Sequence, residues 1–168
     1  MKAVKLTVLT FVSTVLFTSM AFAAEAKYAF VDLSKVFDSY QKTKEYDAVL
    51  QKEADGFQKE REGLINKIKD GQGKLALLKD AEKQKLSEDL DKQKQGLIEY
   101  DQNKRTELAK KRDDKVREIL QEIQKIVEDI AKKESYTFVF NDRVLIYGDQ
   151  TKNITEQVLK ALNDSYKK

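Results

Sequence analysis

Apolar residues recur at intervals of seven through the middle of the chain, against a background dense in Lys, Glu, Asp and Gln. One such line contains Leu50, Phe57, Leu64, Gly71 and Leu78. Further along, residues 116–130 carry a wider apolar stripe at three-and-four spacing. Spacing of seven is typical of the seam between two coiled helices, whereas a wide stripe indicates a helix covered by more than one neighbour. The pattern predicts a long helical hairpin over residues 41–134 that is best packed at residues 116–130.

The turn of this hairpin has two candidate positions. Residues 70–73, Asp-Gly-Gln-Gly, have local turn chemistry, because Asp and Gly accommodate the backbone angles of tight turns. A global constraint favours a later turn: strands are predicted before the first helix and after the second, and helices of equal length would return both strands to one sheet. The midpoint of the helical region then places the hairpin tip at residues 80–87. Gly71 and Gly73 would lie inside the outgoing helix and make the distal arm easier to bend.

Short segments rich in aromatic and β-branched residues flank the helical region. Residues 28–33 predict a strand, followed by Ser34 as the N-cap of a helix. Residues 136–140 and 144–147 predict two strands joined as a β-hairpin. The last segment begins at Asn153, an N-cap residue with Glu three positions later, and continues with apolar residues at helical spacing. A closing helix is therefore expected.

These segments predict an α+β fold, in which a small β-sheet oligomerisation body carries a long antiparallel α-helical coiled-coil hairpin. The body consists of residues 24–40 and 135–168, and the hairpin arm of residues 41–134. A body of about fifty residues buries little surface alone, and its predicted strands are apolar on both faces. The closing helix can cover one face, so a second copy of the chain is expected to cover the other. The predicted oligomer interface contains Tyr28, Phe30, Val31, Tyr136, Phe138, Phe140 and Leu145.

Residues 1–23 have the pattern of a cleavable signal peptide. Lys2 and Lys5 precede an apolar run over residues 6–17, and Ala-Phe-Ala at residues 21–23 has the small residues of a signal-peptidase site. The apolar run is short for a membrane-spanning helix and is interrupted by Thr and Ser. We therefore expect an exported protein that loses this segment.

The composition limits the possible chemistry. Removal of Lys2 and Lys5 would leave 30 of the 32 basic side chains against 29 acidic ones, a net charge close to +1. A near-neutral exported chain argues against nucleic-acid binding, which depends on basic surfaces. The chain has no His and no Cys, the usual acid–base catalysts, thiol nucleophiles and transition-metal ligands. We expect a protein that is not an enzyme, binds no nucleic acid and holds neither a metal nor a cofactor.

Two short motifs flank the arm. They are Val31-Asp32-Leu33 with Val36-Phe37 shortly after, and Asn153-Ile154-Thr155-Glu156 leading into Val158-Leu159. Together with the signal peptide and the charged hairpin, they resemble the Skp/OmpH family of periplasmic outer-membrane-protein chaperones over the whole mature chain. The resemblance implies a periplasmic homotrimer whose three helical tentacles enclose a cavity for unfolded outer-membrane or envelope proteins, without use of ATP. Members are commonly more basic, whereas residues 67–85 carry a net charge of only +3. This weakens the expected attraction to acidic clients, lipid or lipopolysaccharide.

Client contacts are expected on the distal arm, where apolar and basic side chains occur without a fixed motif. Many weak contacts of this kind give avidity without sequence specificity. The alternative for most of these leucines is burial between the two helices, and Leu77 is the best candidate for exposure because it lies off the heptad line. The predicted client-binding residues are Lys74, Leu75, Leu77, Leu78, Lys79, Lys83, Lys85, Leu86 and Leu90.

The alternative function is structural, as a coiled-coil spacer or fibre subunit of the cell envelope. Such a role predicts rigid arms with an uninterrupted apolar seam. Arg61, Gly71 and Glu82 interrupt the seam of this chain, which favours the chaperone over the spacer.

Overall fold

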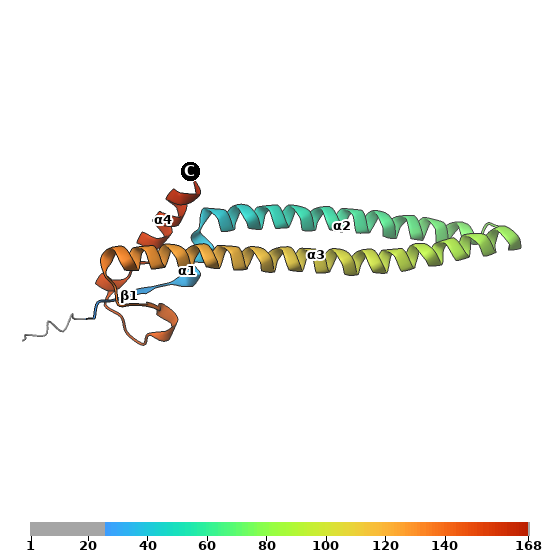
Figure 1. The fold of residues 1–168 in the computed structure, drawn as a ribbon. Coiled ribbons are helices and arrows are strands. Elements are labelled where there is room, and N and C mark those ends of the chain that lie inside the picture. The colour runs from blue at the N-terminus through green and yellow to red at the C-terminus, as the bar shows by residue number, and fades with distance from the viewer. Residues whose placement is uncertain (1–25, 168) are drawn as a thin grey trace, which may run out of the picture.

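A computed structural model describes residues 26–167, so the predicted signal peptide lies outside the described residues. Two long helices lie side by side and extend from a small body that holds both ends of the described chain (Figure 1). Within these residues the fold is mostly helical with a small sheet, which agrees with the predicted α+β class. The elements in chain order are β1 (Tyr28–Val31), α1 (Leu33–Ser39), α2 (Gln41–Leu75), α3 (Asp80–Glu134), β2 (Phe138–Asn141), the short 3-10 helices η1 (Asp142–Val144) and η2 (Gln150–Lys152), and α4 (Thr155–Tyr166).

The hairpin tip lies at residues 76–79, so the predicted tip at residues 80–87 is wrong. Equal helix lengths were the wrong assumption, because α2 has 35 residues and α3 has 55. The backbone breaks at Tyr40, where ψ is 130°, and α1 packs within the body instead of extending the arm. The last turns of α3 therefore pass the start of α2 and pack against α1 and α4. As predicted, the Asp-Gly-Gln-Gly segment at residues 70–73 stays inside α2.

The turn itself has the sequence Ala-Leu-Leu-Lys, without Gly or Pro. Charges at the two helix ends favour it: Asp80 and Glu82 lie in the first turn of α3, and Lys74 in the last turn of α2. Carboxylates stabilise a helix N-terminus and an ammonium group stabilises a C-terminus through the helix dipole. These charges therefore stabilise both helix ends next to a turn whose own residues have weak turn propensity.

The seam between α2 and α3 includes two of the residues that interrupt the apolar pattern. Arg61 Nε lies 2.9 Å from an oxygen of Asp101 on α3, so the charged position is paired across the helices. Gly71 faces Leu90, which is 2% exposed, and a Cβ at residue 71 would lie 2.5 Å from the Cδ2 atom of that leucine. Gly71 therefore provides room for a buried leucine, a role that its sequence position did not reveal.

The sheet differs from the predicted β-hairpin. β1 and β2 pair in parallel, with Tyr28 opposite Phe138 and Phe30 opposite Phe140. The pairing is parallel because the chain passes through the whole helical arm after β1. It then enters β2 at the end of the sheet where β1 begins. The predicted second strand at residues 144–147 is absent, and η1 and an irregular segment take its place. This segment folds back over β1, where Arg143 Nη2 donates to Ser34 Oγ at 2.5 Å and Gly148 lies against the Phe30 ring.

Two helix starts also differ slightly from expectation. Asp32, and not Ser34, caps α1, because its Oδ1 accepts from the backbone N–H of Lys35 at 2.8 Å. Helix α4 begins at Thr155, and Asn153 Oδ1 accepts from the Thr155 N–H at 3.0 Å. The predicted closing helix is thus confirmed, but its N-cap position is Ile154 and not Asn153, which accepts from the first N–H of the helix.

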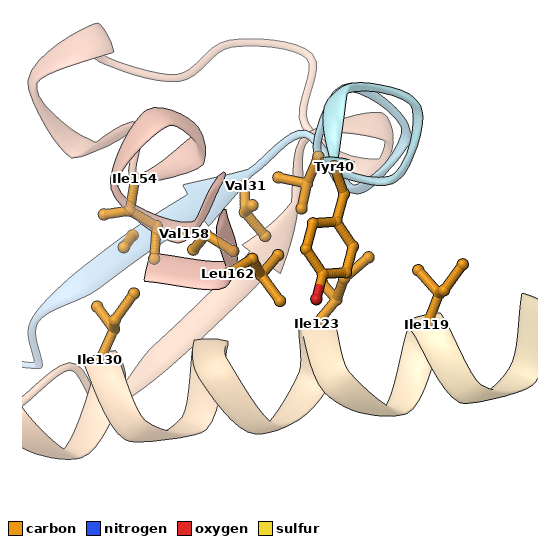
Figure 2. Packing of buried hydrophobic residues seen from close by; sticks show 10 residues of the cluster. Val31, Tyr40, Ile119, Ile123, Ile130, Ile154, Val158 and Leu162 are labelled. Atoms are coloured by element: carbon orange, nitrogen blue, oxygen red, sulfur yellow. The ribbon is translucent and has the colours of Figure 1, made fainter. Parts of the chain in front are cut away.

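The core of the body lies where α3 passes under α1, α4 and the inner face of the sheet. Figure 2 shows Ile119, Ile123 and Ile130 of α3 pointing toward Ile154, Val158 and Leu162, with Val31 and Tyr40 closing the cluster. Val36 and Val158 have no exposed surface, and Ile119, Ile123 and Leu162 are each 1% exposed. The predicted wide stripe on residues 116–130 is confirmed, except that Leu120 is 45% exposed.

Candidate functional site

The tip of the arm exposes one leucine among several lysines. Leu77 lies in the turn between α2 and α3 and is 85% exposed. Its neighbours Lys74, Lys79, Lys83 and Lys85 are exposed, and none of these four forms an ion pair with any residue of the described range 26–167. We call Leu77 and these four lysines the tip surface. It combines an apolar side chain with cationic groups that are free to bind a partner.

The other four leucines of the predicted client-binding set lie wholly or partly in the helix seam. Leu90 is buried against Gly71. Leu75, Leu78 and Leu86 are half-buried. The structure therefore favours the seam alternative for Leu90 and leaves Leu77 as the exposed leucine of the set.

Additional apolar side chains are exposed along the arm, and the sequence pattern did not single them out. Val49 on α2 and Ile98 on α3 are 52% and 51% exposed. Val49 is adjacent to Leu50 of the heptad line, so only the helical phase distinguishes the exposed residue from the half-buried one. With Leu77 at the tip, these side chains distribute apolar surface over the length of the arm.

A groove of about 270 Å³ lies between α2 and α3 in the middle of the arm. Phe57 and Tyr100 are among the residues that line it, with ring centroids 5.7 Å apart. Charged side chains form the rim, where Lys111 Nζ pairs with Glu53 at 2.7 Å across the two helices. The groove offers a small aromatic surface within a charged rim.

The root of the arm is held by an ion-pair network. Lys42 Nζ lies 2.6 Å from Glu118 and 2.5 Å from Glu122, and the Tyr40 hydroxyl donates to Glu122 at 3.0 Å. Hydrogen bonds from Lys115 and Lys42 lower the pKa of Glu118 to about 2. Burial alone would lower the pKa of Lys42, but hydrogen bonds to Glu118 and Glu122 outweigh it and raise that pKa. Burial and the bond to Glu122 raise the pKa of Tyr40 to about 12.

This network predicts an acid-dependent loss of stability. Because the pKa of Glu118 is about 2 in the folded chain and ordinarily 4.5, folding favours the carboxylate, whose contribution is present above pH 4.5 and lost as the pH falls toward 2. We expect Glu118→Gln to lower the Tm near neutral pH, and this difference from the unsubstituted protein to shrink between pH 4.5 and 2. Thermal melts at several pH values measure it. A difference that stays constant with pH would contradict the assignment.

The outer face of the sheet carries an exposed aromatic cluster. Tyr28, Phe138 and Phe140 are 50%, 54% and 38% exposed, and their ring centroids lie 6.0 to 6.3 Å apart in stacked pairs. We call these three residues the aromatic face. Next to it, the segment after β2 exposes Val144, Ile146 and Tyr147. So much adjacent apolar surface is unusual for a chain that stays alone in water.

The remaining residues of the predicted interface lie deeper. Phe30 and Val31 are 7% and 3% exposed within their own chain: Val31 packs in the core of the body, whereas Phe30 is covered by the segment at Gly148. Tyr136 and Leu145 are half-buried, and the ammonium group of Lys27 lies 4.4 Å from the Tyr136 ring centroid. The aromatic face is therefore the part of the predicted interface that is available for contact.

No group of three or more His, Cys, Asp or Glu side chains within residues 26–167 is arranged to hold a metal ion. No helix in the same range has both the length and the apolar composition needed to cross a membrane.

Comparisons with known proteins agree with this architecture. Residues 27–162 match the family model for outer membrane protein (OmpH-like). No curated protein sequence is similar enough to match the chain. A crystal structure of a candidate outer membrane chaperone (OmpH-like) from Caulobacter crescentus CB15 is similar in fold, with a TM-score of 0.78 at 12% identity over 83% of this chain and 85% of that one. Since the family match covers the body and the whole arm, this chain belongs to the OmpH-like outer membrane protein family.

Proposed function

We propose that this protein is an ATP-independent holdase chaperone of the periplasm, which binds unfolded outer-membrane or envelope proteins and prevents their aggregation. The observation that carries the proposal is the arm itself. Two long helices extend away from the body and expose separate apolar side chains, Val49, Leu77 and Ile98, among charged ones. Membership of the OmpH-like family supports a chaperone role.

The proposed mechanism is multivalent holding without a fixed binding motif. An unfolded client offers many short apolar segments, and separated apolar side chains along an arm can each contact one of them weakly. Such contacts add through effective concentration when several are made at once. The lysines of the tip surface would attract acidic segments and increase the association rate. The sequence has no glycine-rich phosphate loop, so the proposed cycle uses no nucleotide.

The body is proposed to assemble three chains. The aromatic face needs a cover, and two further copies of the body would provide it while their arms enclose a shared cavity. A homotrimer places the apolar side chains of three arms around one client, which increases the number of simultaneous contacts. The tip surface would also suit contact with the anionic headgroups of lipid or lipopolysaccharide. No structural observation favours the spacer alternative, which has no use for exposed apolar side chains along the arm.

The test of this function is suppression of aggregation. A denatured β-barrel membrane protein is diluted from urea into buffer, with or without the mature protein and without nucleotide, and light scattering is followed. We expect protection at stoichiometric ratios of assembled protein to client. Lack of protection at several-fold molar excess would support the spacer, and release of client that depends on ATP would contradict the proposed cycle.

Substitutions at the tip surface are expected to weaken client capture and leave the fold intact. The variant Leu77→Ser, Lys79→Glu, Lys83→Glu should lower the client association rate several-fold at low salt, and less at moderate salt, because screening acts over about 8 Å at physiological ionic strength. Its Tm should change little, since all three side chains are exposed. A control variant, Lys44→Glu with Lys167→Glu, changes the net charge equally but near the body. Equal association rates for both variants at both salt concentrations would remove the tip surface from the mechanism.

A further inference from the structure

The first turn of the arm helix α2 is capped by a residue from the other end of the chain. Tyr40 precedes α2 in an extended conformation and contributes no side-chain cap. The exposed N–H groups at the start of a helix need acceptors. Here the backbone N–H of Gln41 donates to Oδ1 of Asn163 at 3.0 Å, across 122 positions of sequence. Helix α4 thus supplies a hydrogen-bond acceptor to the start of the arm.

A second side chain of α4 binds the same turn. The Tyr166 hydroxyl donates to Glu45 Oε2 at 2.6 Å, and Glu45 also accepts from the Gln41 side chain at 2.9 Å. The Tyr166 ring packs edge-on against the Tyr40 ring, with centroids 5.9 Å apart. Tyr40 itself is 2% exposed. We call Asn163 and Tyr166, with the residues they contact in the break and first turn of α2, the root latch.

The position of the root latch suggests a mechanical role. Helix α3 runs unbroken from the tip into the body, whereas α2 joins the body only through the break at Tyr40. Long helices bend easily, so an arm carried on α3 alone would swing relative to the body. Helix α4 is anchored in the core by Val158 and Leu162, and its last turn holds the start of α2 (Figure 1). The arm is thus attached to the body through α3, through the break at Tyr40 and through α4. Together these three attachments resist such bending.

The ion pairs of Lys42 differ from the root latch in what they connect. Glu118 and Glu122 belong to α3, so these pairs hold the two arm helices together. The contacts of Asn163 and Tyr166 connect α2 to a helix of the body. When the arm moves away from α4, the contacts of Asn163 and Tyr166 are stretched, whereas the ion pairs of Lys42 are not.

We infer that Asn163 and Tyr166 are positioning residues that fix the angle between the arm and the body. Their loss leaves each part folded but widens the range of arm angles. A consequence, which rests on the proposed function, is that the root latch limits the size of the client that the arms enclose.

The absence of cysteine from the chain makes a distance measurement direct. Spin labels are placed on α4 at Lys160→Cys and on the distal half of α2 at Lys69→Cys, both exposed positions. Labelled chains are diluted with unlabelled ones so that only distances within a chain are measured. The unsubstituted root latch should give a narrow distance distribution. Asn163→Ala with Tyr166→Phe should give a clearly broader one, with an unchanged melting of the body by circular dichroism.

Two control variants separate positioning from general weakening. Asn163→Asp keeps an acceptor oxygen at the same place and should retain the narrow distribution. Glu156→Ala removes an ion pair between α4 and α1 within the body, where Lys35 Nζ lies 2.7 Å from Glu156. This variant should also keep the narrow distance distribution. Amide exchange at residues 41–45 should become about tenfold faster in the double variant, as loss of a helix cap implies.

Either of two results would overturn the inference. One is an unchanged distance distribution in the double variant, even with faster amide exchange, which would reduce the root latch to a local cap. The other is equal broadening in Glu156→Ala, which would indicate a loosened body. Because the distances are measured without client, failure of the aggregation assay would leave this result intact and would count only against the proposed function.

Discussion

Ile123→Ala is expected to lower the free energy of unfolding by about 2 to 5 kcal/mol, the usual range for removing a well-buried branched side chain. Ile123 is 1% exposed and lies at the centre of the cluster that joins α3 to α1 and α4 (Figure 2). Its loss would leave a cavity lined by residues from three elements that cannot collapse independently. Urea denaturation at a fixed protein concentration measures the change, because dissociation of an assembly also contributes to stability.

Leu120→Ala is the matched control for this prediction. Leu120 lies on the same helix, less than one turn away, but is 45% exposed. Its truncation should cost no more than about 1 kcal/mol, since half of the side chain already contacts solvent. If both variants lose the same stability, the root of the arm is not packed as the structure indicates.

Phe138→Asp is expected to dissociate the proposed oligomer. Phe138 is 54% exposed in the single chain and stacks with Tyr28 and Phe140, so a charge there would have to be buried in any assembly through the aromatic face. Burial of an unpaired carboxylate is strongly unfavourable. Light scattering after size exclusion should give the mass of three chains for the unsubstituted mature protein and a smaller mass for the variant.

Val49→Asp provides the control, because Val49 is exposed to a similar degree, 52%, but lies on the arm. This variant should keep the mass of the unsubstituted protein. An unchanged mass for Phe138→Asp would show that the aromatic face is not the interface, and dissociation of Val49→Asp would place the interface on the arms.

The sequence was sufficient to predict the helices but not the point where they turn. The apolar stripe of residues 116–130 correctly indicated the best-packed part of the arm, because burial by several neighbours leaves a wide periodic signal. The tip was misplaced because α1 and α2 form one continuous helical pattern, and nothing in that pattern marks the break at Tyr40. The break depends on contacts with α3 and α4, which only the folded chain provides.

The predicted β-hairpin was wrong for a related reason. Residues 144–147 have the composition of a strand, yet they pair neither with β2 nor with β1, whose other edge is bridged at Phe30 by Asn153. Within the described chain, this segment leaves Val144, Ile146 and Tyr147 exposed, and Gly148, which follows it, lies against the Phe30 ring. Composition predicted a tendency to form a strand, but in the folded chain this segment packs over β1 without joining the sheet.

The sequence indicated which kinds of residue could bind a client, but it was less able to indicate which of them are exposed. Leu77 was separated correctly from the seam as an exposed leucine, although the reason differs: it lies in the turn between the helices, and not on an outer helix face. Leu90 was included because a leucine in a charged helix could face either way. Its burial depends on the missing side chain of Gly71 on the facing helix, a contact that no local pattern contains.

Shortening the arms tests most directly whether they hold the client. Deleting residues 58–75 and 80–97 removes eighteen residues, or about five helical turns, from each helix. The native turn at residues 76–79 then joins the shortened helices in the same register and on the same faces. The core of the body and the aromatic face are unchanged by this deletion. If the arms hold the client, the shortened protein will keep the solution mass and the body melting of the full chain but lose protection of a denatured β-barrel protein at ratios where the full chain protects. Undiminished protection by the shortened protein would contradict the account, because the distal arm would then not be needed to hold the client.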